Sequence, residues 1–256
     1  MIPKLLGCGA LGLVLSVTSA AVALANQGSP WRVASAILGV VTVTVPMGVG
    51  LYLWRLDPTN RIGRLLVVLG LAWFFVTLTA SADPLLYSTG RVAVWLVEPA
   101  LIYLTLAYPS GHLTQRSHRI IAPAAWLIVL VGFLPTTLVE KHFPTQSIWG
   151  TCTTDCPRNV FAINGGVANS VATTVIPMGL EVVVIALFAS VVAATWNRLR
   201  RGSPLMRRTL VPVLATLLLR YVAYVLYLVL RRSGVSPEVL VPVGFAIALT
   251  LPVSTL

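Results

Sequence analysis

The chain is built from long apolar segments, and nearly all of its charged residues fall between them. Each segment has roughly 17–26 residues, and a hydrocarbon core about 30 Å thick requires about 20 residues of helix. The segments are Leu5–Ala25, Trp31–Trp54, Leu65–Ala82, Val92–Tyr108, Ile120–Val139, Val171–Trp196, Leu210–Leu230 and Val239–Leu256. Backbone groups inside lipid must be hydrogen-bonded within their own segment. We therefore predict an all-α, polytopic transmembrane helix bundle with about eight spanning helices.

The composition agrees with a membrane protein. Hydrophobic residues make up 57% of the 256 residues and charged residues 10%, whereas soluble domains carry about 25% charged residues. Nearly every residue lies in or beside a span, which leaves no room for a soluble catalytic domain. We interpret residues 1–256 as one membrane domain. Its last segment ends without a basic anchor or a polar tail, so we expect it to be the N-terminal part of a longer protein.

The net charge of +11 indicates a lipid surface rather than nucleic acid. The basic residues lie in short loops beside span ends, where Lys and Arg set topology and contact anionic lipid. No basic, aromatic-interleaved soluble surface is available to a nucleic acid. The predicted membrane-surface anchors are Arg55, Arg61, Arg64, Arg198, Arg200, Arg201, Arg207 and Arg208.

The orientation follows from these loops. Alternating loops place eleven basic residues on one side and six on the other, with Arg220 excluded because it lies within a span. The richer side is expected to be cytoplasmic, which puts both termini inside a bacterial plasma membrane. The first segment has a second interpretation, because Ala23-Leu24-Ala25 resembles a signal-peptidase site. Cleavage there would leave seven spans and the remaining topology unchanged.

Cys152 and Cys156 lie in the longest loop, about 140–170, on the predicted outer side. An oxidising compartment permits a disulfide between them, with free thiols or a metal site as the alternatives. A metal site would need further ligands, and His142 and Asp155 are the nearest candidates. The chain has neither an HExxH helix nor a glycine-rich phosphate loop. We therefore favour the disulfide and expect no metal, no cofactor and no catalytic residue.

Three ionisable residues, Glu98, Glu181 and Arg220, lie within the predicted spans. Such groups are costly in lipid, so they usually face the bundle interior and are often paired. Measured from the segment ends, Glu181 and Arg220 both lie roughly 15 Å deep on antiparallel neighbours. We predict an ion pair between them, with Glu98 nearer the outer side. The pair either fixes the helix register or forms a ligand or proton site.

Three loop motifs carry a resemblance to a known family. They are Arg55-Leu56-Asp57-Pro58-Thr59-Asn60-Arg61-Ile62-Gly63-Arg64-Leu65-Leu66, Leu106-Ala107-Tyr108-Pro109-Ser110-Gly111-His112-Leu113 and Cys156-Pro157-Arg158-Asn159-Val160-Phe161. They resemble the multi-pass membrane regions of bacterial sensor histidine kinases. In that family a kinase core follows the last helix. The resemblance implies a sensor or anchoring module, a homodimer, and a response regulator that is reached through the kinase core.

A stand-alone small-solute transporter or channel is the alternative function. It would use Glu98, Glu181 and Arg220 in a central path. Transporters are often built from internal repeats with interrupted helices in matching positions, and no convincing repeat is present. We therefore expect a two-component membrane sensor that passes a helix displacement from its last span into the cytoplasm.

Overall fold

The computed structural model describes residues 2–143, 149, 152, 156–163, 176–201 and 204–255, which form helices, turns and loops and no strand. Eight helical stretches within these residues are long and apolar enough to cross a membrane. The predicted all-α polytopic bundle is therefore confirmed. The elements are α1 Ile2–Ala25, α2 Arg32–Leu56, α3 Arg61–Thr77, η1 Leu78–Ala80, α4 Pro84–Ala107, α5 Arg116–Leu127, η2 Ile128–Phe133, α6 Leu134–Val139, α7 Ile176–Arg201, α8 Pro204–Arg232 and α9 Pro237–Thr255.

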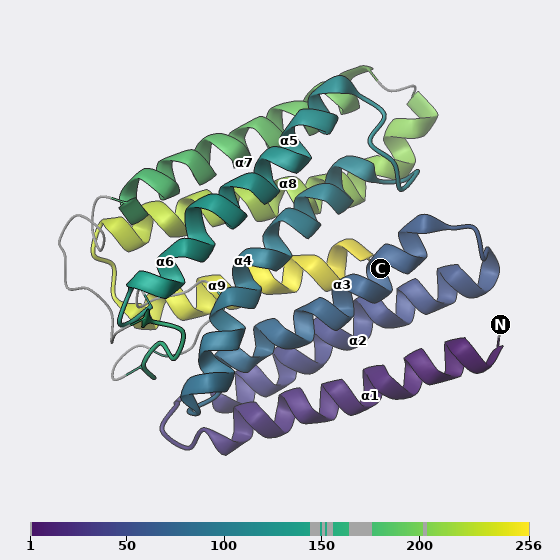
Figure 1. Ribbon diagram of the computed structural model, residues 1–256. Coiled ribbons are helices and arrows are strands. Elements are labelled where there is room, and N and C mark those ends of the chain that lie inside the picture. Colours follow the sequence, from purple (N-terminus) through teal and green to yellow (C-terminus); the bar gives the residue numbers. More distant parts are fainter. Residues whose placement is uncertain are drawn as a thin grey trace.

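Consecutive spans run antiparallel and define two ends of the bundle (Figure 1). The basic end carries the α2–α3, α4–α5 and α7–α8 connections. The loop end carries the α1–α2, α3–α4 and α8–α9 connections and the long connection between α6 and α7. Helices α1, α2 and α3 form one group, α5, α7 and α8 another, and α4 packs against both α3 and α5. The last helix, α9, lies between α2 and α8 and closes the bundle.

Helix α4 begins eight residues earlier than the apolar segment that predicts it. The Asp83 side chain accepts hydrogen bonds from the N–H groups of Leu85 and Leu86, and Pro84 occupies the first turn. An N-terminal Asp cap followed by Pro is a favoured helix start. Arg91, predicted to lie in a loop, is therefore inside the helix and only 5% exposed.

Glycines bring α2 and α3 into backbone contact. A Cβ added at Gly50 would lie 2.7 Å from the Gly63 carbonyl oxygen, and one added at Gly63 would lie 2.9 Å from the Gly50 oxygen. Small residues at a helix crossing permit this approach inside a membrane, where dispersion contacts rather than hydrophobic exclusion hold helices together. The α2–α3 crossing therefore requires glycine at positions 50 and 63, because a side chain at either position would clash with the backbone of the other helix.

The fifth span is interrupted by a π-helical turn, η2. The N–H of Leu134 donates to the Val129 carbonyl five residues earlier, and Pro123 and Pro135 flank the turn in α5 and α6. Proline lacks an N–H and disturbs the regular ladder, and single π turns often lie at functional sites. The wider turn presents Ile128, Val129 and Phe133 to a cavity described below.

We expect Gly50→Ala to lower thermal stability, with Gly48→Ala as the matched control. Both positions are inside α2, but a Cβ at Gly48 meets nothing within 4 Å. In a helix interior, alanine stabilises the folded state by about 0.5–1 kcal/mol relative to glycine, whereas overpacking destabilises it by about 1–3 kcal/mol. The melting temperature in detergent should fall for Gly50→Ala, and it should stay the same or rise for Gly48→Ala. Equal melting temperatures would contradict the close α2–α3 contact.

Candidate functional site

A cavity of about 120 Å³ lies among α4, α5, η2, α6, α7 and α8. A water molecule needs about 10–15 Å³ of such volume, so the cavity is large enough for several waters. Five ionisable side chains and five aromatic side chains line it, and the rest of its wall is mainly aliphatic. They are Arg91, Glu98, Glu140, Glu181 and Arg231, with Trp95, Phe133, Phe188, Tyr224 and Tyr227.

A buried ion pair between α4 and α8 lies beside this cavity. Arg220 Nη2 lies 2.8 Å from Glu98 Oε1, and Arg220 is fully buried. The guanidinium carbon is 5.9 Å from the Trp73 ring centroid and 5.1 Å from that of Trp149. Charge pairing and cation–π contacts together offset part of the desolvation cost of the arginine.

The predicted Glu181–Arg220 pair is wrong. Glu181 instead pairs with Arg231 and with Arg232, whose Nε lies 2.6 Å from Glu181 Oε2. Arg231 is eleven residues beyond Arg220 on α8, which is roughly 17 Å along a helix axis. The apolar segments begin and end away from the true helix ends, so depths measured from them are in error. Glu98, predicted to lie nearer the outer side, is the fifteenth residue of the 24-residue α4. It therefore lies near the middle of this helix, where it pairs with Arg220.

Trp149 reaches the ion pair from the long loop at the loop end. Its ring lies 5.2 Å from that of Trp73 on α3, measured between centroids, in an edge-to-face arrangement. Its carbonyl oxygen accepts a hydrogen bond of 2.9 Å from the Thr79 hydroxyl. A loop residue thus forms part of the wall around a charge in the bundle interior, a role that no feature of the sequence indicates.

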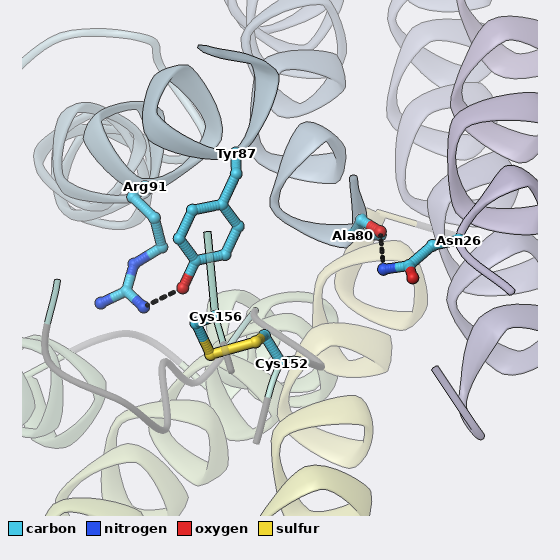
Figure 2. Close-up of a disulfide and its surroundings, with 6 residues drawn as sticks. All are labelled: Asn26, Ala80, Tyr87, Arg91, Cys152 and Cys156. Atoms are coloured by element: carbon cyan, nitrogen blue, oxygen red, sulfur yellow. Dashed lines mark hydrogen bonds between the residues drawn. A yellow bond between two sulfur atoms is a disulfide. The ribbon is translucent and has the colours of Figure 1, made fainter. Parts of the chain in front are cut away.

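Arg91 lies on α4 toward the loop end. Its Nη1 donates to the Tyr87 hydroxyl at 3.2 Å (Figure 2), and its guanidinium carbon is 5.3 Å from the Phe143 ring centroid. Tyr87 and Phe143 pack edge to face. Aromatic contacts and one hydroxyl acceptor therefore hold a buried cation beside the cavity.

Glu140 follows α6 and is 5% exposed. Its Oε2 has no hydrogen-bond partner among the described residues. Burial raises the pKa of this carboxyl from 4.5 to about 7, although the positive charge of Arg91 acts in the opposite direction. Its backbone is tied to the loop, because Asn159 Nδ2 donates to the Glu140 carbonyl at 2.8 Å and to that of Thr137 at 2.6 Å.

The two loop cysteines form a disulfide, with their Cα atoms 5.6 Å apart (Figure 2). On one side of this bridge the chain continues to Asn159, which fastens the loop to α6. On the other side lies Trp149, which contacts the ion pair. In the sequence, the covalent ring therefore lies between Trp149 and Asn159, two of the described loop residues that contact the bundle.

The predicted basic anchors lie at or beside the basic end. Arg198 is half-buried and donates to the Leu106 carbonyl at 3.4 Å, while Arg200 stacks over the ring of Trp196, 5.1 Å from its centroid. The side chains of Arg201, Arg207 and Arg208 lie outside the described residues. Arg55 in the last turn of α2 and Arg61 and Arg64 in the first turn of α3 are exposed.

Toward the basic end, apolar packing closes the cavity. Its innermost lining residues include Ile102 and Phe188, which pack in a buried cluster with Leu106 and Val191. Within this cluster the Tyr221 hydroxyl lies 3.1 Å from that of Thr105, bridging α8 and α4. The cavity is therefore charged toward the loop end and blind at its inner end.

No family model, curated protein or solved structure matches this chain.

We expect Glu98→Gln and Arg220→Gln each to lower stability sharply. Removing one partner of a buried pair strands the other charge and costs about 3–5 kcal/mol. The double variant should lose less than the sum of the two single losses. Thermal unfolding in detergent would measure this cycle.

The control is the same cycle between Glu181→Gln and Arg220→Gln, which should be additive. Additivity for Glu98 with Arg220, or strong coupling for Glu181 with Arg220, would contradict the pairing seen in the structure.

Stability should fall as the pH rises between about 4.5 and 7, because folded Glu140 retains its proton over this range and an unfolded carboxyl does not. The charged groups that share its cavity are Arg91, Glu181 and Arg231 on the neighbouring helices, with Glu98 deeper on α4. Melting temperatures of wild type and Glu140→Gln at pH 5 and 8 test this. The decline should be smaller in the variant; an unchanged decline would assign it to another group.

Proposed function

We propose that the chain is the membrane-embedded sensor and anchoring module of a bacterial two-component histidine kinase. The loop end faces out of the plasma membrane, and both termini of the chain are cytoplasmic. The blind cavity at the loop end supports this function best, because it offers a stimulus a binding place without a path across the membrane. The resemblance of the loop motifs to sensor kinases supports the same assignment.

The packing of α8 supplies a route from the cavity to the last helix. Tyr227 and Leu228 line the cavity and also pack in a buried cluster with Leu240 and Ile247 of α9. A ligand that displaces α8 therefore acts on the helix that leads toward the cytoplasm. A kinase core beyond Leu256 would receive this displacement, as a homodimer, and pass phosphate to a response regulator.

A transporter or channel remains the second candidate. The observation in its favour is that Glu98 lines the cavity while paired with Arg220. A transporter that couples solute binding to the movement of an ion or proton would require such a charged residue in its path. Transport also requires access from the opposite side. The Thr105–Tyr221 hydrogen bond and the apolar cluster around it occupy that side, which favours the sensor.

The test is phosphorylation of the full-length gene product in proteoliposomes supplied with radiolabelled ATP. We expect label on a histidine, stable to base and labile to acid. Tyr227→Ala should alter the labelling rate severalfold, because it weakens the contact between α8 and α9. Val222→Ala, on an exposed position of α8, is the matched control and should leave the rate unchanged.

Solute uptake by the same proteoliposomes distinguishes the alternatives. If the proteoliposomes take up a solute, the Glu98→Gln variant does not, and no histidine is labelled, the chain is a transporter and the sensor proposal is wrong. Labelling that is insensitive to Tyr227→Ala would leave the anchoring role but contradict the route through α8.

A further inference from the structure

Two carboxylate oxygens of the cavity residues lack hydrogen-bond partners in the described structure. They are Oε2 of Glu98 and Oε2 of Glu140. Both residues line the cavity, and they are only 8% and 5% exposed. A buried acceptor without a donor is costly, and more so when it is charged. The cavity therefore presents unused acceptors for a donor.

The two cations that line the cavity, Arg91 and Arg231, already have partners. Arg231 is paired with Glu181, and Arg91 donates to the Tyr87 hydroxyl and lies over an aromatic ring. Arg220 holds Glu98 through Nη2 and is not among the cavity-lining residues; its Nε and Nη1 have no hydrogen-bond acceptor among the described residues, and its guanidinium lies over two indole rings. An anionic ligand in the cavity would have to displace a contact of Arg91 or Arg231, whereas a cationic donor would meet carboxyl oxygens without a donor.

The walls of the cavity suit the apolar body of such a donor. Trp95 and Phe133 lie 5.3 Å apart between ring centroids, and Phe188 and Tyr224 lie 4.9 Å apart. Aromatic rings attract cations through their negative faces and bury large apolar areas. Glu98 lies two turns beyond Arg91 on α4, about 10 Å further from the loop end at 1.5 Å per residue.

We propose that the cavity binds a small amphipathic ammonium ion, whose ammonium group donates to Glu98 Oε2 while its apolar body lies between the aromatic walls. When it is ionised, Glu140 adds negative charge nearer the loop end and draws the cation inward. This inference rests on the proposed function, because it names the chemical class of the stimulus that the sensor cavity receives.

The test uses 2-phenylethylammonium as the probe, with the purified chain in nanodiscs of uncharged phosphatidylcholine. Isothermal titration should detect binding of this cation and much weaker binding of 2-phenylethanol and 3-phenylpropanoate, which carry the same phenylethyl body. Empty nanodiscs correct for partition into lipid. Tighter binding of the anion than of the cation would overturn the proposal.

Variants locate the site. Glu98→Gln should raise the Kd of the probe roughly 10- to 100-fold, the equivalent of one charge-assisted hydrogen bond. Because this variant strands Arg220, Glu140→Gln provides a second reading at pH 8, above the pKa of about 7 that burial gives the Glu140 carboxyl. The expected weakening is about three- to tenfold, from the loss of a nearby charge. Glu238→Gln, exposed in the first turn of α9, is the matched control and should bind as wild type does.

Cation binding that is unchanged in both Glu98→Gln and Glu140→Gln would also overturn the proposal. Failure of the proposed function looks different. Selective binding without histidine phosphorylation would retain the ammonium site and remove the sensor, whereas phosphorylation without cation binding would retain the sensor and remove this stimulus.

Discussion

The Glu98–Arg220 ion pair determines how the second half of the bundle is arranged. An arginine at the centre of a membrane helix costs about 2.5–3.5 kcal/mol on insertion scales, so its helix must turn it toward a partner. Here the partner is 122 residues away on α4, and the pair fixes the rotation of α8 against that helix. With α8 so rotated, Tyr224, Tyr227 and Arg231 follow on the face that lines the cavity.

The loop between α6 and α7 is part of the same arrangement. Trp149 covers the guanidinium of Arg220, and Asn159 binds the carbonyl groups at the end of α6. Each contact satisfies a group that lipid could not satisfy, either a buried charge or an open helix end. The loop is therefore coupled to the membrane interior by the same physics that holds the helices together.

The sequence predicts the helices well and the ion pair poorly, for a physical reason. Whether a segment can span a bilayer depends on its own length and polarity, which one stretch of sequence contains. Which charges meet depends on where two helices begin. The apolar segments leave Arg91 in a loop because it is charged, although Asp83 and Pro84 mark the true start of α4 and give the correct depth of Glu98. The contact of Trp149 has no local signal, because it is made by tertiary packing alone.

A bundle selected only for stability would avoid the features that make the cavity. The bundle of this chain contains a π turn between two prolines, a buried arginine packed against aromatic rings, and two carboxyl oxygens of cavity residues without donors. Filling this space with aliphatic side chains would remove several buried polar groups, and such replacements are often neutral or stabilising. Departures of this kind from consistent packing are expected where function requires them. These features meet around one cavity beside the Glu98–Arg220 pair, which is why the function of this chain is best sought there.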